Sequence, residues 1–258
     1  MKKIIILLAF LIGSSQVMAQ GGQHFTFNGT VEYEKTLNLY ALMKKNMDDN
    51  DGFIQSIFEA FKKDNPQFKK LKSTLTFTKD KALFTPLPDE NPLKNSFFWD
   101  GAPTTQQTNV TYTDLATNTS VTQKKVFEEQ FLMRDSVRKI NWKITSETRD
   151  IAGYTCRRAN ALVMDSVYVV AFYTDEIPVS AGPESFAGLP GMILGLAMPH
   201  ENITWFATKV TDMTIPEGKV VAPAKGKPVN KKQLKAKLDD AIGNWGKEGR
   251  EYLKLFML

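Results

Sequence analysis

The chain has 258 residues, a single cysteine and a formal net charge of +5. This length is enough to bury a substantial core, and one cysteine excludes an internal disulfide. The charge is too mild to indicate a nucleic-acid partner, because Lys2 and Lys3 belong to an N-terminal leader whose removal leaves +3.

The N-terminus has the features of a cleaved export signal. The two lysines precede an apolar run over residues 4–12, and residues 17–19 form a small-residue cleavage site. The apolar run is well short of the roughly 20 residues that a bilayer span needs. We therefore expect cleavage after Ala19, a periplasmic location with possible attachment to the outer membrane, and no transmembrane span in the mature chain.

Apolar residues alternate with period two along much of the chain, which predicts strands. In residues 24–35, for example, Phe25, Phe27, Val31 and Tyr33 all fall at odd positions. A turn at residues 79–80 predicts a hairpin between residues 75–77 and 82–84. Further β-rich runs are residues 109–115, 120–127, 140–146, 154–163, 166–173, 192–196 and 203–210.

Two segments have helical periodicity instead. A helical insertion is predicted over about residues 41–63, where an Asp-rich cap precedes the apolar stripe Phe53, Ile54, Ile57, Phe58 and Phe61. A C-terminal helix is predicted over about residues 230–255. It begins at the capping pair Asn230 and Gln233, and its apolar face holds Leu234, Leu238, Ile242 and Trp245.

Many short strands in series, without a strand–helix–strand rhythm, predict an α+β fold dominated by antiparallel β-structure. We expect one domain over residues 20–258. Its sheet would be curved or form an incomplete (half) barrel, covered by two helices. Residues 216–228 are rich in Pro, Gly and Lys and are interpreted as a surface connector.

The segment over residues 173–194 contains three prolines and three glycines around an aromatic residue. It predicts a shaped irregular loop that leads into a buried strand, and such rigidity suits the rim of a preformed apolar pocket. The candidate ligand-binding residues are Tyr154, Tyr173, Phe186, Pro190 and Met192. The alternative is that the aromatic residues of the β-rich part, Trp205 among them, are simply core.

No catalytic residue and no metal site is predicted, and the cofactor is left unassigned. His200 follows Met192 and Met198, as a soft copper site would require, although methionines after an apolar strand usually fill a core. Cys156 is interpreted as a small buried strand residue and not as a reactive thiol. A hydrolase that uses carboxylates alone would need two acids converging in a cleft.

Several segments together resemble the GLPGLI family, also called the Porph_ging family, of exported Bacteroidota proteins. They are residues 142–144, 151–159, 172–178 and 182–183, followed by Gly188-Leu189-Pro190-Gly191-Met192-Ile193-Leu194. The chain departs from the usual pattern at Phe172, Met192 and Gly195. The element Gly153-Tyr154-Thr155-Cys156 is also similar to one in exported half-barrel proteins akin to lipoprotein carriers.

The resemblance implies a periplasmic or outer-membrane-associated protein, often encoded near TonB-dependent receptors, with no established catalytic residues. The leading hypothesis is therefore non-enzymatic. An apolar or amphiphilic, lipid-like ligand, or a partner protein, would bind at the curved sheet. The alternative is an accessory subunit of a TonB-dependent outer-membrane receptor system, and a carboxylate hydrolase or a copper-binding protein is less well supported.

Overall fold

The structure is a computed structural model that describes residues 25–45, 51–94 and 102–258. The predicted export signal, residues 1–19, lies outside the described residues, as does most of the Asp-rich stretch at residues 48–52. Among the described helices, none is both long and apolar enough to cross a membrane.

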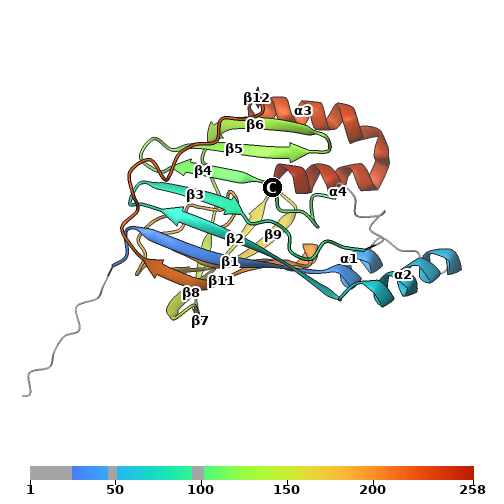
Figure 1. Cartoon of the computed structure of the whole chain (residues 1–258), viewed down its shortest axis with the longest axis horizontal. Helices are drawn as coiled ribbons and strands as arrows, with labels where there is room; N and C mark the ends of the chain where they lie inside the picture. Colours follow the sequence, from blue (N-terminus) through green and yellow to red (C-terminus); the bar gives the residue numbers. More distant parts are fainter. Residues whose placement is uncertain (1–24, 46–50, 95–101) are drawn as a thin grey trace, which may run out of the picture.

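The described residues form one large, mainly antiparallel sheet, as the alternation predicts (Figure 1). Its strands are β1 (Gly29–Asn38), β2 (Phe68–Phe77), β3 (Lys81–Pro86), β4 (Val110–Asp114), β5 (Thr119–Val126), β6 (Glu129–Ser136), β7 (Lys143–Ile151), β8 (Tyr154–Val163), β9 (Val167–Thr174), β10 (Met192–Met198), β11 (Ile203–Asp212) and β12 (Lys227–Val229).

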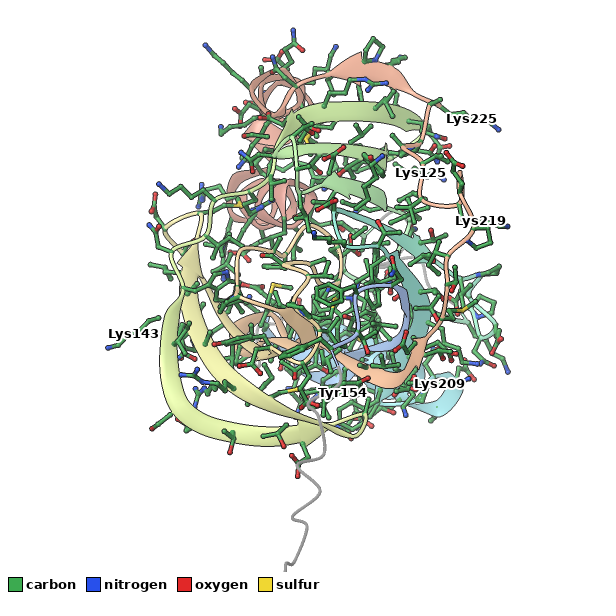
Figure 2. The ribbon with its side chains drawn as sticks, turned by 90° about the vertical axis from the view of Figure 1, so that its left-hand side faces the viewer. Lys125, Lys143, Tyr154, Lys209, Lys219 and Lys225 are labelled. Carbon is green, nitrogen blue, oxygen red and sulfur yellow. The ribbon has the colours of Figure 1, made fainter. Side chains whose placement is uncertain are left out.

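The sheet joins two meanders at the N-terminal strand. Its order is β12-β6-β5-β4-β3-β2-β1-β11-β10-β9-β8-β7, so β1 lies in the interior between β2 and β11. β12 and β7 are the edges, and the sheet remains open and does not close into a barrel. Figure 2 shows that β7 and β8 bend along their length. The sequence pattern predicts most of these strands but not that the first strand joins the two halves.

The core follows the alternation of the central strands. In β1, Val31, Tyr33 and Leu37 are buried, while the residues at even positions, 30–38, are partly or fully exposed. Lys35 falls in the same buried series, so β1 places a charged side chain at a core position. Burial of a lysine is rare and calls for partners, which the site described below supplies.

The helical insertion consists of α1 (Leu39–Lys45) and α2 (Gly52–Asp64). The side chain of Asp51 accepts hydrogen bonds from the main-chain N–H groups of residues 53 and 54 and so caps α2, as predicted. The predicted apolar stripe is only partly correct. Phe58 and Phe61 are buried, whereas Phe53 is 72% exposed because it lies in the first turn, beyond the sheet.

The predicted C-terminal helix is two helices, α3 (Lys231–Ile242) and α4 (Gly246–Met257), which lie side by side (Figure 1). The capping box of Asn230 and Gln233 begins α3 as predicted. The chain reverses through a 3-10 turn to Gly246, whose φ of +64° favours glycine. Trp245 is consequently half exposed and does not extend the buried face of α3.

Two strands were not predicted. β6 is rich in polar and charged residues, and only Phe131 and Leu132 in it are buried. β12 has three residues at the end of the expected connector and pairs in parallel with β6. Neither strand has enough apolar residues for alternation to be visible in the sequence.

Candidate functional site

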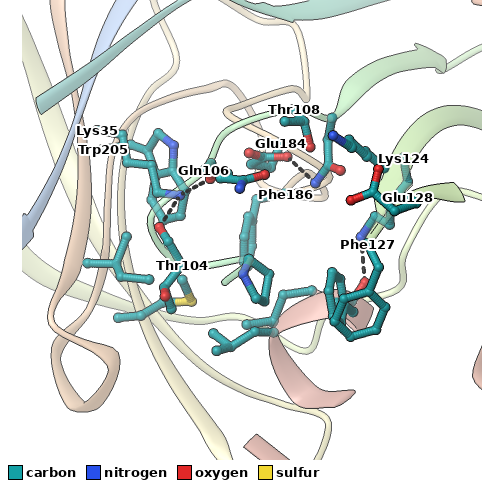
Figure 3. Close-up of a pocket in the computed structure, with 18 residues that line it drawn as sticks. Lys35, Thr104, Gln106, Thr108, Lys124, Phe127, Glu128, Glu184, Phe186 and Trp205 are labelled. Carbon is teal, nitrogen blue, oxygen red and sulfur yellow. Dashed lines mark hydrogen bonds between the residues drawn. The ribbon is translucent and has the colours of Figure 1, made fainter. Parts of the chain in front are cut away.

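A pocket of about 440 Å³ lies between the sheet and the C-terminal end of α4 (Figure 3). Its volume falls in the range of small-molecule sites, roughly 300–1,000 Å³. The elements that line it are distant in sequence. They are β1, β5, β10, β11, the segment over residues 103–109, the loop before β10, and the end of α4.

Much of the pocket lining is apolar. Its wall is made of Phe186, Met198, Ile203, Trp205, Leu255 and Phe256. Phe127 adds to it, because its ring meets the ring of Phe256 edge-on at 5.3 Å between centroids. Such a wall excludes water from apolar groups and so favours an apolar ligand.

Lys35 enters the pocket from β1 with every donor engaged. Its ammonium donates to the main-chain oxygens of Thr104, at 3.1 Å, and Gln106, at 3.0 Å. It also lies 5.1 Å from the ring centroid of Trp205, its pairing partner on β11. Burial lowers the pKa of Lys35 to about 8, against the opposing effect of Glu184. Lys35 therefore anchors the segment over residues 103–109.

Lys124 enters from β5 and is less fully engaged. Its ammonium donates one hydrogen bond, to the main-chain oxygen of Phe256 at 2.6 Å. Its two other N–H groups have no hydrogen-bond partner among the described residues. Burial lowers the pKa of Lys124 to about 8, Glu184 opposes this shift, and the nearby Arg138 and Lys231 add to it.

Glu184 lies between these lysines in the view of Figure 3. Its backbone has a φ of +55°, an uncommon conformation for a non-glycine residue that is enriched at functional sites. Asn109 donates a hydrogen bond to its carboxylate at 3.0 Å. Burial raises the pKa of Glu184, while Lys35, the Asn109 hydrogen bond and Lys124 counteract the shift.

Trp205, in the pocket wall, has an indole N–H group without a hydrogen-bond partner among the described residues. The Nε1 atom of this group is buried. A buried donor without a partner costs about 1–3 kcal/mol, so such groups in folded proteins usually meet water or a ligand.

The loop before β10 is held in place by main-chain hydrogen bonds and by one hydrogen bond from the side chain of Trp142. The N–H of Met192 donates to the oxygen of Ile177 at 2.9 Å, and the N–H of Ile193 donates to that of Ala181 at 2.8 Å. The indole of Trp142 donates to the oxygen of Ala187 at 2.9 Å. These bonds fix the position of Glu184 and Phe186 in the pocket wall.

Residues 162–195 match a family model that is described as a protein of unknown function, Porph_ging. Over this segment the chain is similar to the Porph_ging family. The matched segment runs from β8 to β10 and includes the loop that supplies Glu184 and Phe186. Lys35 and Lys124 lie outside it, so the pocket combines the Porph_ging segment with strands from the N-terminal half.

No curated protein matches the chain. Among solved structures, two crystal forms of PNGF-II, in space groups P21 and C2, align with 79% of this chain at TM-scores of 0.46 and 0.48 and identities of 16% and 15%. The chain spans about a third of their length, 32% and 31%. An uncharacterized conserved protein from Thermus thermophilus aligns with 78% of this chain and 90% of its own, at a TM-score of 0.35 and 5% identity.

The structure places the predicted ligand-binding residues in different environments. Phe186, in the Porph_ging loop, lines the pocket. Tyr173 and Met192 are buried in the main core, and Tyr154 is partly buried against it. Pro190 is exposed at the surface. Only one of the five predicted ligand-binding residues, Phe186, therefore lines the pocket.

Sequence reasoning missed Lys35, Lys124 and Glu184. The alternation of β1 carries a signal for Lys35, because the residue shares the face of Val31 and Tyr33. Lys124 has a weaker signal, since its face of β5 also holds polar residues. Glu184 has no such signal in the sequence, because burial does not alternate regularly along an irregular loop.

The other residues considered in the sequence analysis lie outside this pocket or contribute to it only as packed apolar side chains. His200 is exposed, whereas Met192 and Met198 are buried in the core. The described residues contain no cluster of three or more His, Cys, Asp or Glu side chains that could hold a metal ion. Cys156 is buried, as the sequence predicts, and burial raises its pKa to about 12.

Proposed function

We propose that this chain binds a small amphiphilic ligand in the pocket beneath α4. The observation that carries the proposal is one cavity of about 440 Å³ that joins an apolar wall to the incompletely bonded ammonium of Lys124. A ligand with an apolar chain would bury it against Phe186 and Trp205. Its polar head would satisfy donors that the protein leaves unpaired.

The lining favours binding over hydrolysis. It contains two side-chain carboxylates, Glu128 and Glu184, and burial raises the pKa of Glu184. Glu128 is exposed at the rim, where solvent screens its charge. A carboxylate hydrolase requires two acids with separated pKa values on either side of a substrate, and a buried lysine pair is not part of that arrangement.

We place this binding in the periplasm, where the export signal at residues 1–19 would direct the chain. The open sheet would act there as an incomplete barrel, with α3 and α4 covering one end. The pocket lies beside α4, so this arrangement would shelter the apolar part of the ligand from water.

Titration calorimetry with decan-1-ol, a neutral amphiphile, tests the proposal. We expect one site per chain, and we expect Leu255→Trp to abolish binding because the larger side chain fills the pocket. Leu162→Trp is the matched control, since Leu162 is 59% exposed on β8. Binding that survives Leu255→Trp, or no binding to the unaltered chain by any decyl amphiphile, would refute the proposed function.

A further inference from the structure

We propose that the head group of the ligand is a singly charged anion, a carboxylate, and that Lys124 receives it. This inference rests on the proposed function and deepens it. It makes Lys124 the residue that selects among amphiphiles, while the apolar wall binds their chains.

The first argument is charge balance. The charged side chains in the interior of the pocket are those of Lys35, Lys124 and Glu184, so these three side chains carry one surplus positive charge when all are ionised. At the rim, Lys125 and Glu128 are exposed and offset each other. Burying an uncompensated charge is costly, and a monovalent anion would remove the surplus.

The second argument is the inventory of donors. Lys35 uses its ammonium on two main-chain oxygens and the ring of Trp205. Lys124 has two N–H groups without a partner among the described residues, on the opposite side of the pocket from Trp205. The pocket thus has a surplus of donors, which an acceptor-only group such as a carboxylate would satisfy.

The third argument is position. In Figure 3, Lys124 lies on one side of the pocket beside Phe127 and Glu128, and Lys35 and Trp205 lie on the other. Phe186 lies between the two sides. A carboxylate at Lys124 would therefore direct its chain across Phe186 toward Trp205, along the apolar wall.

A carboxylate fits this site better than a phosphate monoester. The latter carries about −1.5 to −2 charges near neutral pH, which would exceed the single surplus positive charge and oppose Glu184. Fatty-acid-like carboxylates are therefore the ligand class that the pocket selects.

The test compares three ligands with the same chain and different heads, decanoate, decan-1-ol and decylamine, on the full chain by titration calorimetry. At about pH 6.5 decanoate is an anion and decylamine a cation. We expect decanoate to bind about tenfold or more tightly than decan-1-ol, as for hydrogen bonds to a charged group, and decylamine to bind most weakly.

Two variants test whether Lys124 is the source of the preference for decanoate over decan-1-ol. Lys124→Met approximates the apolar part of the side chain and removes its charge. Decanoate affinity should therefore fall about tenfold or more, and decan-1-ol affinity should fall by a clearly smaller factor. Measurable decan-1-ol binding by the variant also shows that the pocket is intact. Lys143→Met removes the same charge from an exposed position on β7 and should change neither affinity (Figure 2).

The outcomes separate this inference from the proposed function. If decan-1-ol and decanoate bind equally, or decylamine binds most tightly, the anion site is wrong but the amphiphile pocket stands. If none of the three binds, both are wrong. If Lys124→Met does not fold, the head-group series on the unaltered chain still decides the question.

Discussion

The ammonium of Lys124 donates a hydrogen bond to the main-chain oxygen of Phe256 at 2.6 Å. This bond ties β5 to the last turn of α4, where main-chain oxygens lack partners within the helix. Arg138 adds two more ties, to the oxygens of Met257, at 2.6 Å, and Leu258, at 2.8 Å. Lys124 therefore both holds the helical wall of the pocket and presents its remaining donors to the interior.

The hydrogen bond between Lys124 and Phe256 predicts that the end of α4 becomes more mobile when the Lys124 ammonium is removed. In the ligand-free chain, Lys124→Met should raise amide hydrogen exchange over residues 253–258, because the end of α4 loses a charged hydrogen bond of about 1.5–3 kcal/mol. Exchange in β1 should not change. Lys143→Met should leave exchange in both regions unaltered. If Lys124→Met does not change exchange at the end of α4, the hydrogen bond from Lys124 does not stabilise that end of the helix.

Ligand affinity should depend on pH through the pocket lysines. Lys124 has a pKa of about 8 in the free protein, set by burial and modified by Glu184, Arg138 and Lys231, and Lys35 titrates in the same region. An anion binds the ammonium form and raises its pKa. Decanoate affinity should therefore be level between about pH 6 and pH 7, where the ligand is an anion, and fall as the pH rises through 8.

Decan-1-ol provides the reference for this titration, because a neutral head has no preference for the charged lysine. Its affinity should vary little over the same range. A decanoate affinity that stays constant from about pH 7 to about pH 9.5 would show that the lysines do not bind the head group.

Two glycines of the Porph_ging segment should differ in their tolerance of alanine. A Cβ on Gly191 would overlap the main-chain oxygen of Thr174 and lie 2.7 Å from its carbonyl carbon. A Cβ on Gly188 meets nothing closer than 3.6 Å, so its cost is the left-handed φ of +95° alone. We expect Gly191→Ala to lower the free energy of unfolding by about 3 kcal/mol or more and Gly188→Ala by about 1–2 kcal/mol.

Urea denaturation measures both changes. Both glycines have a positive φ, +155° at Gly191 and +95° at Gly188, and both substitutions add one methyl group, so the comparison reports mainly the close backbone approach at Gly191. Equal losses at the two positions would mean that β9 and β10 separate freely next to Gly191.

Cys156 should be inert in the folded protein. It is fully buried, and burial raises its pKa from the usual 9.0 to about 12, so the thiolate at neutral pH is about a thousandfold scarcer. Labelling by a disulfide reagent should be fast in denaturant and slower by at least that factor in the native state. Comparable rates would place the thiol at an accessible surface.

How far the sequence predicts this fold depends on alternation. It predicts the extent of β8 and the turn end of the β2–β3 hairpin, where Leu75 and Phe77 are buried at alternate positions, but not the part of β2 before residue 75. It does not predict the pairing of β1 with β11, which joins residues more than 160 positions apart and leaves no local pattern. Nor does it predict β6, whose exposed face and polar composition hide its strand period.

The site is predicted less well than the fold. The Pro/Gly loop is identified as a rigid wall, and Phe186 in it lines the pocket. Tyr173 and Met192 are instead core residues, because β9 and β10 are buried on both faces and alternation no longer separates core from cavity. Lys124 and Glu184 become functional candidates only when three distant segments meet.

A crystal structure of the full chain grown with decanoate tests the central claim most directly. We expect one decanoate in the pocket, with its carboxylate within hydrogen-bond distance of the Lys124 ammonium and its chain against Phe186 and Trp205. A pocket filled by ordered water at concentrations that saturate binding, or decanoate bound elsewhere on the chain, would contradict the account.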